Sequence, residues 1–240
     1  RDLVRSRGLG DVYKRQFVDS YKDLPANITD PSVSTSDWDD ITVPGNWEVQ
    51  GHGTAIYTNH GYEFKPRNPQ PPLLPEANPV GVYRRDFEVP AGWDGRDIYL
   101  HIAGAKSGLY VYVNGKEVGY SEDSKNPAEF LINKYLQPGK NVLTLKIFRW
   151  STGSYLECQD FWRLSGIERD VYLWSQPKIA VNDYRIVSTL DDTYKNGIFS
   201  LAIDIKNHSD KVKNIDVTYE LLDAKGNVLS LIHISEPTRP

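Results

Sequence analysis

The sequence predicts an all-β protein that consists of a jelly-roll sandwich followed by a truncated immunoglobulin-like sandwich. Three observations support this prediction. Apolar and polar residues alternate with a period of two, clusters of turn residues separate the alternating segments, and no long segment shows the 3.6-residue period of an amphipathic helix. With 240 residues, of which 39% are hydrophobic and 25% charged, the composition is that of an ordinary globular protein of one or two domains.

The alternation is clearest between residues 97 and 174. Ile98, Leu100 and Ile102 fall on one face of a predicted strand, because successive side chains of a strand point to opposite faces. Asn114-Gly115 separates two alternating segments and predicts a type I′ hairpin turn, whose two central residues need a positive φ. Long connections between such strands are typical of a jelly roll. The expected strands of this region cover residues 97–102, 109–113, 116–120, 142–150 and 169–174.

A change of composition near residues 175–178 separates a second region from the first. Apolar and polar residues alternate again from 199 to 206 and from 215 to 221, and a turn is expected at 223–226. This pattern is typical of an immunoglobulin-like sandwich, which usually needs about 100 residues. Residues 177–229 supply about half of that length, so we expect the second sandwich to be cut roughly in half.

The two ends of the chain differ from the rest. Residues 1–16 carry five basic and two acidic side chains without periodicity, and both this segment and residues 230–240 look like translated sequencing-adapter read-through from metagenomic data. We therefore interpret both segments as adapter-like artefacts. Foreign segments are not selected to pack, so we expect them to be extended or poorly ordered and to add little to the core. Four apolar residues test this interpretation by their burial: Val4, Leu9, Ile232 and Ile234.

Charge and composition exclude several classes of partner. The formal net charge is −4 at pH 7 and becomes more negative once the basic residues 1–16 are set aside, which argues against nucleic acid and anionic membranes as partners. No run approaches the ~20 apolar residues of a membrane-spanning helix. The single cysteine, Cys158, cannot form an internal disulfide, so the fold must be held by its core.

One segment, residues 149–167, contains the residue types of a binding site. The five histidines lack metal-ligand spacing, and phosphate-binding, dinucleotide-binding and nucleophile-elbow motifs are missing from the sequence. Sugars present an apolar C–H face and a rim of hydroxyls, so their sites combine aromatic rings with carboxylates, and this segment contains both. The alternative is a packed loop whose aromatic rings fill the sandwich and whose carboxylates pair with Arg149 or Arg163.

Several motifs occur in the order seen in bacterial β-galactosidases of glycoside hydrolase family 2. They are residues 43–48, 56–59, 78–83, 113–124 and 149–170, and the resemblance extends over essentially all of residues 17–229. It implies a jelly-roll sugar-binding domain of the galactose-binding-like kind at 17–176 and the first part of an immunoglobulin-like domain at 177–229. In that family a TIM barrel with both catalytic glutamates follows. We therefore expect no catalytic residue in this chain, which would act as a non-catalytic N-terminal fragment.

The resemblance also implies residue roles. Asp160 matches the family aspartate that reaches into the active site of the barrel, where it contacts the galactose 6-hydroxyl and a bound sodium ion. Sodium and magnesium are the cofactors implied for the intact enzyme. Trp162, like Trp150 and Tyr155, either lines the sugar subsite or packs beneath it. Lys106 departs from the family, which often places an asparagine or an acid there to bind the sugar; because lysine is longer and only donates, the specificity or the contact must differ.

Several alternatives remain open at this stage. Glu157 and Asp160, three residues apart, would form an independent pair of a retaining glycosidase only with their carboxyl groups about 5–5.5 Å apart. The leading hypothesis is that the chain completes the substrate pocket of a missing TIM barrel and so contacts a β-galactoside or related carbohydrate. The alternatives are a stand-alone carbohydrate-binding module, an assembly domain of a homo-oligomer, and a fragment of a β-glucuronidase or β-mannosidase. Both the bacterial cytoplasm and the periplasm are compatible with this sequence.

Overall fold

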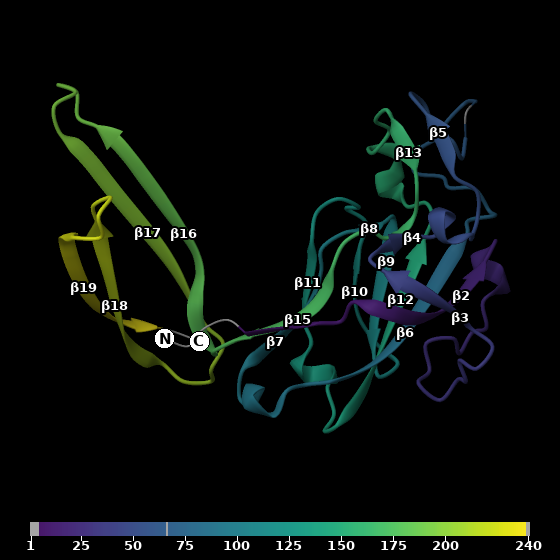
Figure 1. The fold of residues 1–240 in the computed structure, drawn as a ribbon, viewed down its shortest axis with the longest axis horizontal. Coiled ribbons are helices and arrows are strands. Elements are labelled where there is room, and N and C mark those ends of the chain that lie inside the picture. Colours follow the sequence, from purple (N-terminus) through teal and green to yellow (C-terminus); the bar gives the residue numbers. More distant parts are fainter. Residues whose placement is uncertain (1–4, 66, 239–240) are drawn as a thin grey trace. The chain divides into compact units, whose positions relative to one another are not determined.

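The computed structural model of the chain describes residues 5–65 and 67–238 (Figure 1). These residues form two compact units: the first contains the described residues up to 94 together with 98–175, and the second contains 95–97 and 176–238. Strands dominate both units, so the predicted all-β class is confirmed. Within the described residues, no helix is long and apolar enough to cross a membrane. The helices there are short 3₁₀ turns, namely η1 (Tyr21–Asp23), η2 (Glu48–Gln50), η3 (Ala91–Trp93), η4 (Asn133–Tyr135) and η5 (Thr152–Tyr155).

Two antiparallel sheets form the body of the first unit, as a jelly roll requires. The larger sheet has six strands in the order β10-β9-β12-β6-β2-β3, and the smaller has four in the order β1-β15-β7-β11. The larger sheet consists of β2 (Asp11–Val18), β3 (Asp39–Val43), β6 (Val80–Glu88), β9 (Gly108–Val113), β10 (Lys116–Ser121) and β12 (Lys140–Phe148). The smaller consists of β1 (Arg5–Gly8), β7 (Asp97–Ile102), β11 (Ala128–Leu131) and β15 (Val171–Gln176).

The hydrophobic core of the first unit contains the inward-facing residues of both sheets. Leu145 of β12 and its partner Val111 of β9 are fully buried in the larger sheet. Ile98, Leu100 and Ile102 of β7 are buried in the smaller sheet, as the alternation predicts. Because the side chains alternate along each strand, the residues between these positions face outward.

The predicted hairpin between β9 and β10 is also confirmed. Asn114 has φ 52° and Gly115 has φ 77°, the two positive values that a type I′ turn needs. The Asn114 side chain secures the turn, since its amide donates to the Tyr135 carbonyl at 2.9 Å and its oxygen accepts from the Val142 backbone at 2.9 Å.

Short strand pairs complete the first unit at the end that carries the candidate site (Figure 1). β5 (Ile56–Thr58) pairs with β13 (Phe161–Arg163) in a two-stranded antiparallel ribbon. β4 (Gly45–Asn46), β14 (Gly166–Ile167) and β8 (Ala105–Lys106) form a small three-stranded sheet. These pairs bring residues 45–58 to residues 161–167, more than 100 positions later in the chain.

The N-terminal segment packs into the first unit, so the expectation that residues 1–16 add little to the core is wrong. β2 pairs with both β3 and β6, and Leu9, Tyr13 and Arg15 are buried. Along β2, Tyr13 and Arg15 point inward and their neighbours point outward. The sequence does not show this strand as an alternation of apolar and polar residues, because one of its inward positions is the charged Arg15. The adapter origin of the segment stays a prediction.

The C-terminal segment behaves differently. Residues 228–238 form β19, which pairs with β18, while Leu231 and Ile232 remain exposed. Val4 and the side chain of Ile234 lie outside the described residues. The C-terminal expectation therefore holds for the two apolar side chains that can be checked.

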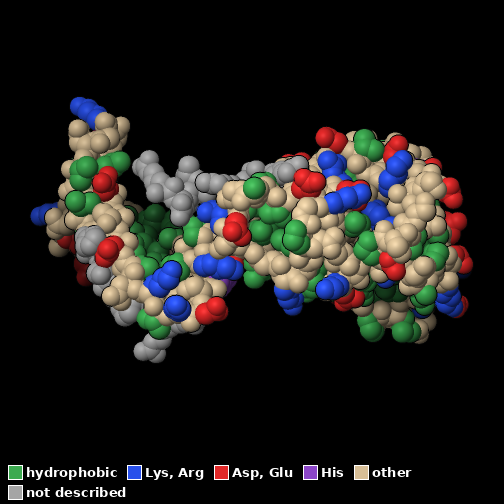
Figure 2. Space-filling model, turned by 90° about the horizontal axis from the view of Figure 1, so that it is seen from below, with side chains coloured by type: hydrophobic (Ala, Val, Ile, Leu, Met, Phe, Trp, Pro, Cys, Tyr) green, Lys and Arg blue, Asp and Glu red, His purple; other side chains and the backbone are tan. Residues whose placement is uncertain are grey.

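The second unit consists of two antiparallel hairpins, which is the arrangement expected of half an immunoglobulin-like sandwich. They pair β16 (Ile179–Leu190) with β17 (Gly197–Asn207) and β18 (Lys213–Leu222) with β19 (Val228–Thr238). Among its described side chains, no apolar residue from 177 to 232 is fully buried. Figure 2 shows hydrophobic side chains on the surface of this unit, in its left part.

Candidate functional site

The β5–β13 ribbon carries an exposed cluster of two aromatic rings and a carboxylate. Tyr57 and Trp162 are cross-strand partners, 55% and 56% exposed, with ring centroids 5.6 Å apart. Asp160 directly precedes β13, and its Oδ1 accepts a hydrogen bond from the Tyr57 hydroxyl at 2.7 Å. We call Asp160, Tyr57 and Trp162 the Asp160 cluster. It brings together two of the predicted site residues, Asp160 and Trp162.

The chemistry of this cluster is suited to binding. The hydrogen bond to Asp160 raises the pKa of Tyr57, so the phenol remains a donor at neutral pH. The exposed carboxylate accepts hydrogen bonds, and the exposed rings offer apolar faces. Sugar sites combine hydrogen-bond acceptors with ring faces, whereas acid–base hydrolysis would need a second, suitably placed carboxyl group.

Phe161 lies between the strand neighbours Asp160 and Trp162 and anchors the ribbon. Three cationic groups lie over its ring: the Arg163 guanidinium at 4.6 Å from the centroid, Lys106 Nζ at 4.8 Å and Lys125 Nζ at 5.6 Å. Such cation–π contacts contribute about 0.5–2 kcal/mol each, more when they are desolvated.

Lys106 is buried, unlike the members of the Asp160 cluster. It lies on β8, and its ammonium group packs on Phe161. Burial lowers the pKa of Lys106, against an opposing effect from the carboxylate of Glu63. The structure therefore places Lys106 among the supports of the ribbon, and a contact of Lys106 with substrate stays a prediction.

The carboxylates that pair with Arg149 and Arg163 come from an unexpected part of the chain. Arg163 Nε lies 3.5 Å from Glu63 Oε2, and Arg149 Nη2 lies 3.7 Å from Glu48 Oε1, with all four side chains largely buried. The expectation that carboxylates of the segment 149–167 form these pairs is wrong. Strand pairing of β5 with β13 brings the earlier segment alongside the later one, and no local spacing reveals that contact.

Glu157 has a separate, structural role. Its Oε1 accepts from the Ser124 backbone at 3.0 Å and its Oε2 accepts from the Ser124 hydroxyl at 2.7 Å. Both oxygens of Glu157 are thus engaged by a loop residue, while Asp160 is engaged by Tyr57. The two carboxylates serve different partners, which argues against their acting as a catalytic pair.

The other two aromatic candidates, Trp150 and Tyr155, are held by hydrogen bonds within the fold. Trp150 donates its indole N–H to Glu63 at 3.0 Å, and the buried Tyr155 donates its hydroxyl to the Leu73 carbonyl. Phe64 contacts both rings, with centroids 5.6 and 5.1 Å away. Of the three aromatic candidates, only Trp162 is exposed at the Asp160 cluster.

Sequence reasoning missed Tyr57 and Glu63 as parts of this region. Tyr57 lies within the motif 56–59, so the motif itself was a signal, but its partner Asp160 is far away in sequence. Glu63 lies outside the motifs, and only its position opposite Arg163 and Trp150 shows its importance. In the described part of the chain, no group of three or more His, Cys, Asp or Glu residues could hold a metal ion.

Comparisons with known proteins identify the family of the chain. Residues 16–177 match the family described as glycosyl hydrolases family 2, sugar binding domain. The chain is 42% identical over 224 residues to a beta-galactosidase of Priestia megaterium, covering 92% of this chain and 22% of that protein. It is 42% identical over 201 residues to a beta-galactosidase of Psychromonas ingrahamii, covering 84% of this chain and 19% of that protein. The chain thus spans about a fifth of the length of these relatives.

Solved structures show the same fold. Bacteroides uniformis beta-glucuronidase 2, covalently bound to cyclophellitol-6-carboxylate aziridine, matches with a TM-score of 0.76 and 21% identity, over 99% of this chain and 26% of that chain. A beta-glucuronidase of an uncultured Clostridium species matches with a TM-score of 0.67 and 18% identity, over 99% of this chain and 39% of that chain. At these identities the likeness concerns the fold alone.

Proposed function

The chain belongs to the glycosyl hydrolases of family 2, and from this premise we propose that it is the non-catalytic N-terminal part of an enzyme that hydrolyses terminal β-D-galactosides. Its role there is to complete the substrate pocket of a TIM barrel formed by the rest of the protein. The single observation that carries this proposal is the Asp160 cluster, in which an exposed carboxylate and two exposed rings stand together on the β5–β13 ribbon.

Asp160 is the proposed sugar-binding residue of this chain. Its carboxylate accepts the proton of a sugar hydroxyl, and Tyr57 holds that carboxylate in place through the 2.7 Å hydrogen bond. Trp162 offers a ring face next to it, at which a pyranose can stack. Catalysis by a pair of carboxyl groups is assigned to the part of the enzyme outside this chain.

Sodium belongs to the proposal, with Asp160 as one of its ligands. A carboxylate oxygen is the right kind of donor for a hard cation, but such cations take about six or more oxygen ligands. The Asp160 cluster offers one carboxylate and one hydroxyl, so the remaining ligands must come from the rest of the enzyme or from water. Bound there, the ion would supply positive charge that orients a sugar hydroxyl. Magnesium and a homo-oligomeric assembly remain predictions for the intact enzyme.

A galactoside is favoured over a glucuronide or a mannoside as the substrate. The curated relatives at about 42% identity are named beta-galactosidases, whereas the beta-glucuronidases among the solved structures share only 21% identity or less with this chain. The stand-alone binding module and the assembly domain are weaker alternatives, because the chain matches one continuous part of much longer hydrolases.

A domain exchange tests the proposal. The matching N-terminal region of the Priestia megaterium beta-galactosidase is replaced by this chain, and hydrolysis of 2-nitrophenyl β-D-galactoside is measured. We expect the chimera to be active, and both this chain alone and the relative without its N-terminal region to be inactive. A folded chimera that is no more active than the shortened relative would contradict the proposal.

A further inference from the structure

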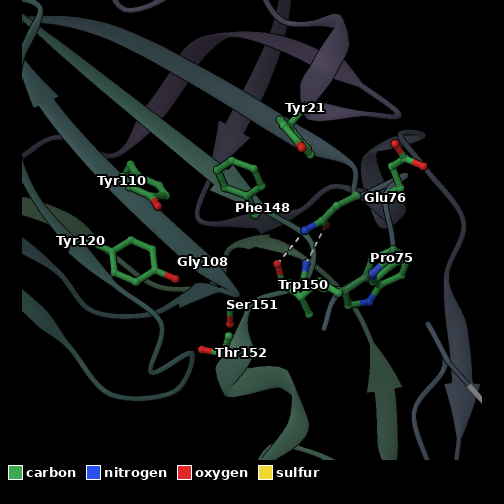
Figure 3. A pocket seen from close by; sticks show the side chains of 12 residues that line it. Tyr21, Pro75, Glu76, Gly108, Tyr110, Tyr120, Phe148, Trp150, Ser151 and Thr152 are labelled. Atoms are coloured by element: carbon green, nitrogen blue, oxygen red, sulfur yellow. Dashed lines mark hydrogen bonds between the residues drawn. The ribbon is translucent and has the colours of Figure 1, made fainter. Parts of the chain in front are cut away.

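A second aromatic surface lies on the outer face of the six-stranded sheet (Figure 3). Tyr110 of β9 and Phe148 of β12 alternate with residues of the hydrophobic core, so they project from the opposite face. With Tyr120 of β10, Tyr21 and Trp150 they line a hollow of about 530 Å³. Ligand sites in proteins typically have about 300–1,000 Å³, so this hollow has the size of a small-molecule site.

The rings form a continuous wall of this hollow. Tyr110 contacts Tyr120 with centroids 4.5 Å apart and Phe148 with centroids 5.7 Å apart, and Tyr21 lies 6.3 Å from Phe148. Lys146 Nζ packs over Tyr110 at 5.0 Å and supports the wall. Tyr120 and Tyr21 are 43% and 46% exposed, so ring faces remain open to solvent. Exposed apolar surface in a concavity commonly marks a binding site.

Polar groups border the rings. Glu76 lies on the opposite side of the hollow and is paired with Lys22. Asn78 is held in place by the backbone of Trp150. The Asn78 amide donates to the Trp150 carbonyl at 2.8 Å, and the Asn78 side-chain oxygen accepts from the Trp150 N–H at 3.1 Å. Burial and the nearby Glu122 raise the pKa of Tyr120, so this hydroxyl keeps its proton at neutral pH. The hollow therefore combines ring faces with a carboxylate and a phenolic hydroxyl.

We propose that this hollow binds a carbohydrate, with Tyr110 and Tyr120 against the C–H face of a pyranose ring and Glu76 accepting hydroxyl protons. A sugar has one apolar face and a polar rim, and the hollow has the matching rings and rim groups. The ion pair of Glu76 with Lys22 is exposed, so the carboxylate can still accept a hydrogen bond from a sugar hydroxyl. None of the residues that line the hollow belongs to the Asp160 cluster, so this inference goes beyond the proposed function.

The test is a titration of the 240-residue chain with galactose, glucose, lactose, cellobiose and xylobiose, followed by saturation-transfer NMR. At least one of these sugars should bind with a dissociation constant in the millimolar range. Tyr120→Ala, which removes an exposed ring, should weaken that binding about tenfold or more, and Tyr21→Ala should weaken it to a smaller extent. Tyr184→Ala is the matched control, because it removes an exposed ring that lines neither the hollow nor the Asp160 cluster and should leave the affinity unchanged.

Two results would overturn the inference. One is that none of the five sugars binds at 50 mM to the folded chain, with folding checked by tryptophan fluorescence. The other is that Tyr120→Ala and Tyr21→Ala both keep the wild-type affinity, or that Trp162→Ala alone removes binding. These outcomes are independent of the domain exchange, because they concern this chain without a barrel, so failure here and failure of the proposed function can be told apart.

Discussion

The two units of the chain use the same alternating strands but reach different degrees of burial. In the first unit two sheets cover each other, and residues such as Leu145 and Leu100 are excluded from solvent. In the second unit each strand has a hairpin partner, yet Ile186 and Leu190 remain more than half exposed. The difference shows that alternation determines which face of a strand is apolar, whereas burial requires a second layer on that face.

This contrast has a consequence for stability. Burial of apolar area contributes roughly 25 cal/mol per Å², so a closed sandwich gains most of its stability from its core. A two-stranded hairpin in water is marginally stable by itself. The Asp160 cluster lies entirely in the first unit, so the proposed sugar contact depends on the better-packed part of the chain.

The largest expected effect concerns hydrogen exchange. Amides of β12, which is paired on both sides by β6 and β9, should exchange only through unfolding of the whole first unit, while amides of β17, paired with β16, should exchange through local opening. A difference of about 5 kcal/mol corresponds to more than a thousandfold in protection. Exchange followed by mass spectrometry measures it. Equal protection of β12 and β17 would contradict the contrast between the units.

The next effect is the cost of removing apolar side chains. Leu145→Ala removes a fully buried side chain and should lower the free energy of unfolding by about 2–5 kcal/mol. The matched change Leu190→Ala, at a position 51% exposed, should cost less than about 1 kcal/mol. All six tryptophans lie in residues 38–174, so urea unfolding followed by tryptophan fluorescence measures the effect of Leu145→Ala in the first unit. The effect of Leu190→Ala is measured by hydrogen exchange of the β16 and β17 amides. If Leu145→Ala leaves the midpoint unchanged, the core assigned to this unit is incorrect.

A smaller effect is expected at the buried Lys106. Its pKa is lowered by burial, so between that pKa and the ordinary value of 10.5 the unfolded chain binds more protons than the folded chain, and stability rises with pH. Lys106→Met keeps the length of the side chain and removes this rise. The melting temperature of the variant minus that of the wild type should therefore decrease from pH 7 to pH 10. The exposed Lys14→Met is the control, and a difference that stays constant with pH would contradict the burial of the charge.

Much of the first unit could be predicted from the sequence. The turn at Asn114-Gly115 and the buried face of residues 98–102 were predictable because both depend on local patterns. β2 was missed because Arg15 occupies an inward position, where a search for apolar residues expects none. A local pattern therefore fails wherever a charged side chain is buried with support from neighbours that are distant in sequence.

The candidate site was predicted only in part, for a related reason. Asp160 and Trp162 were found through their motif, but Tyr57, which fixes the Asp160 carboxylate, and Glu63, which pairs with Arg163, come from a segment about 100 residues earlier. These contacts arise from strand pairing, so they cannot be predicted from the spacing of residues within one segment. Lys106 was proposed as a sugar contact, and its burial on Phe161 could not be read from its neighbours in sequence.

The most direct test of the proposed sugar contact is the sodium dependence of kcat/KM for Asp160→Asn in the chimera described above. Because Asp160 is exposed and its hydrogen-bond donor Tyr57 is exposed as well, the substitution should leave the unfolding midpoint nearly unchanged. Hydrogen bonds to a charged group contribute roughly 1.5–3 kcal/mol, so kcat/KM should fall by about ten- to a hundredfold, with a weaker response to sodium. Asp40→Asn, an exposed carboxylate in an ion pair with Lys14, should change neither quantity. Normal kinetics and an unchanged sodium response in Asp160→Asn, together with a lowered unfolding midpoint, would contradict the account.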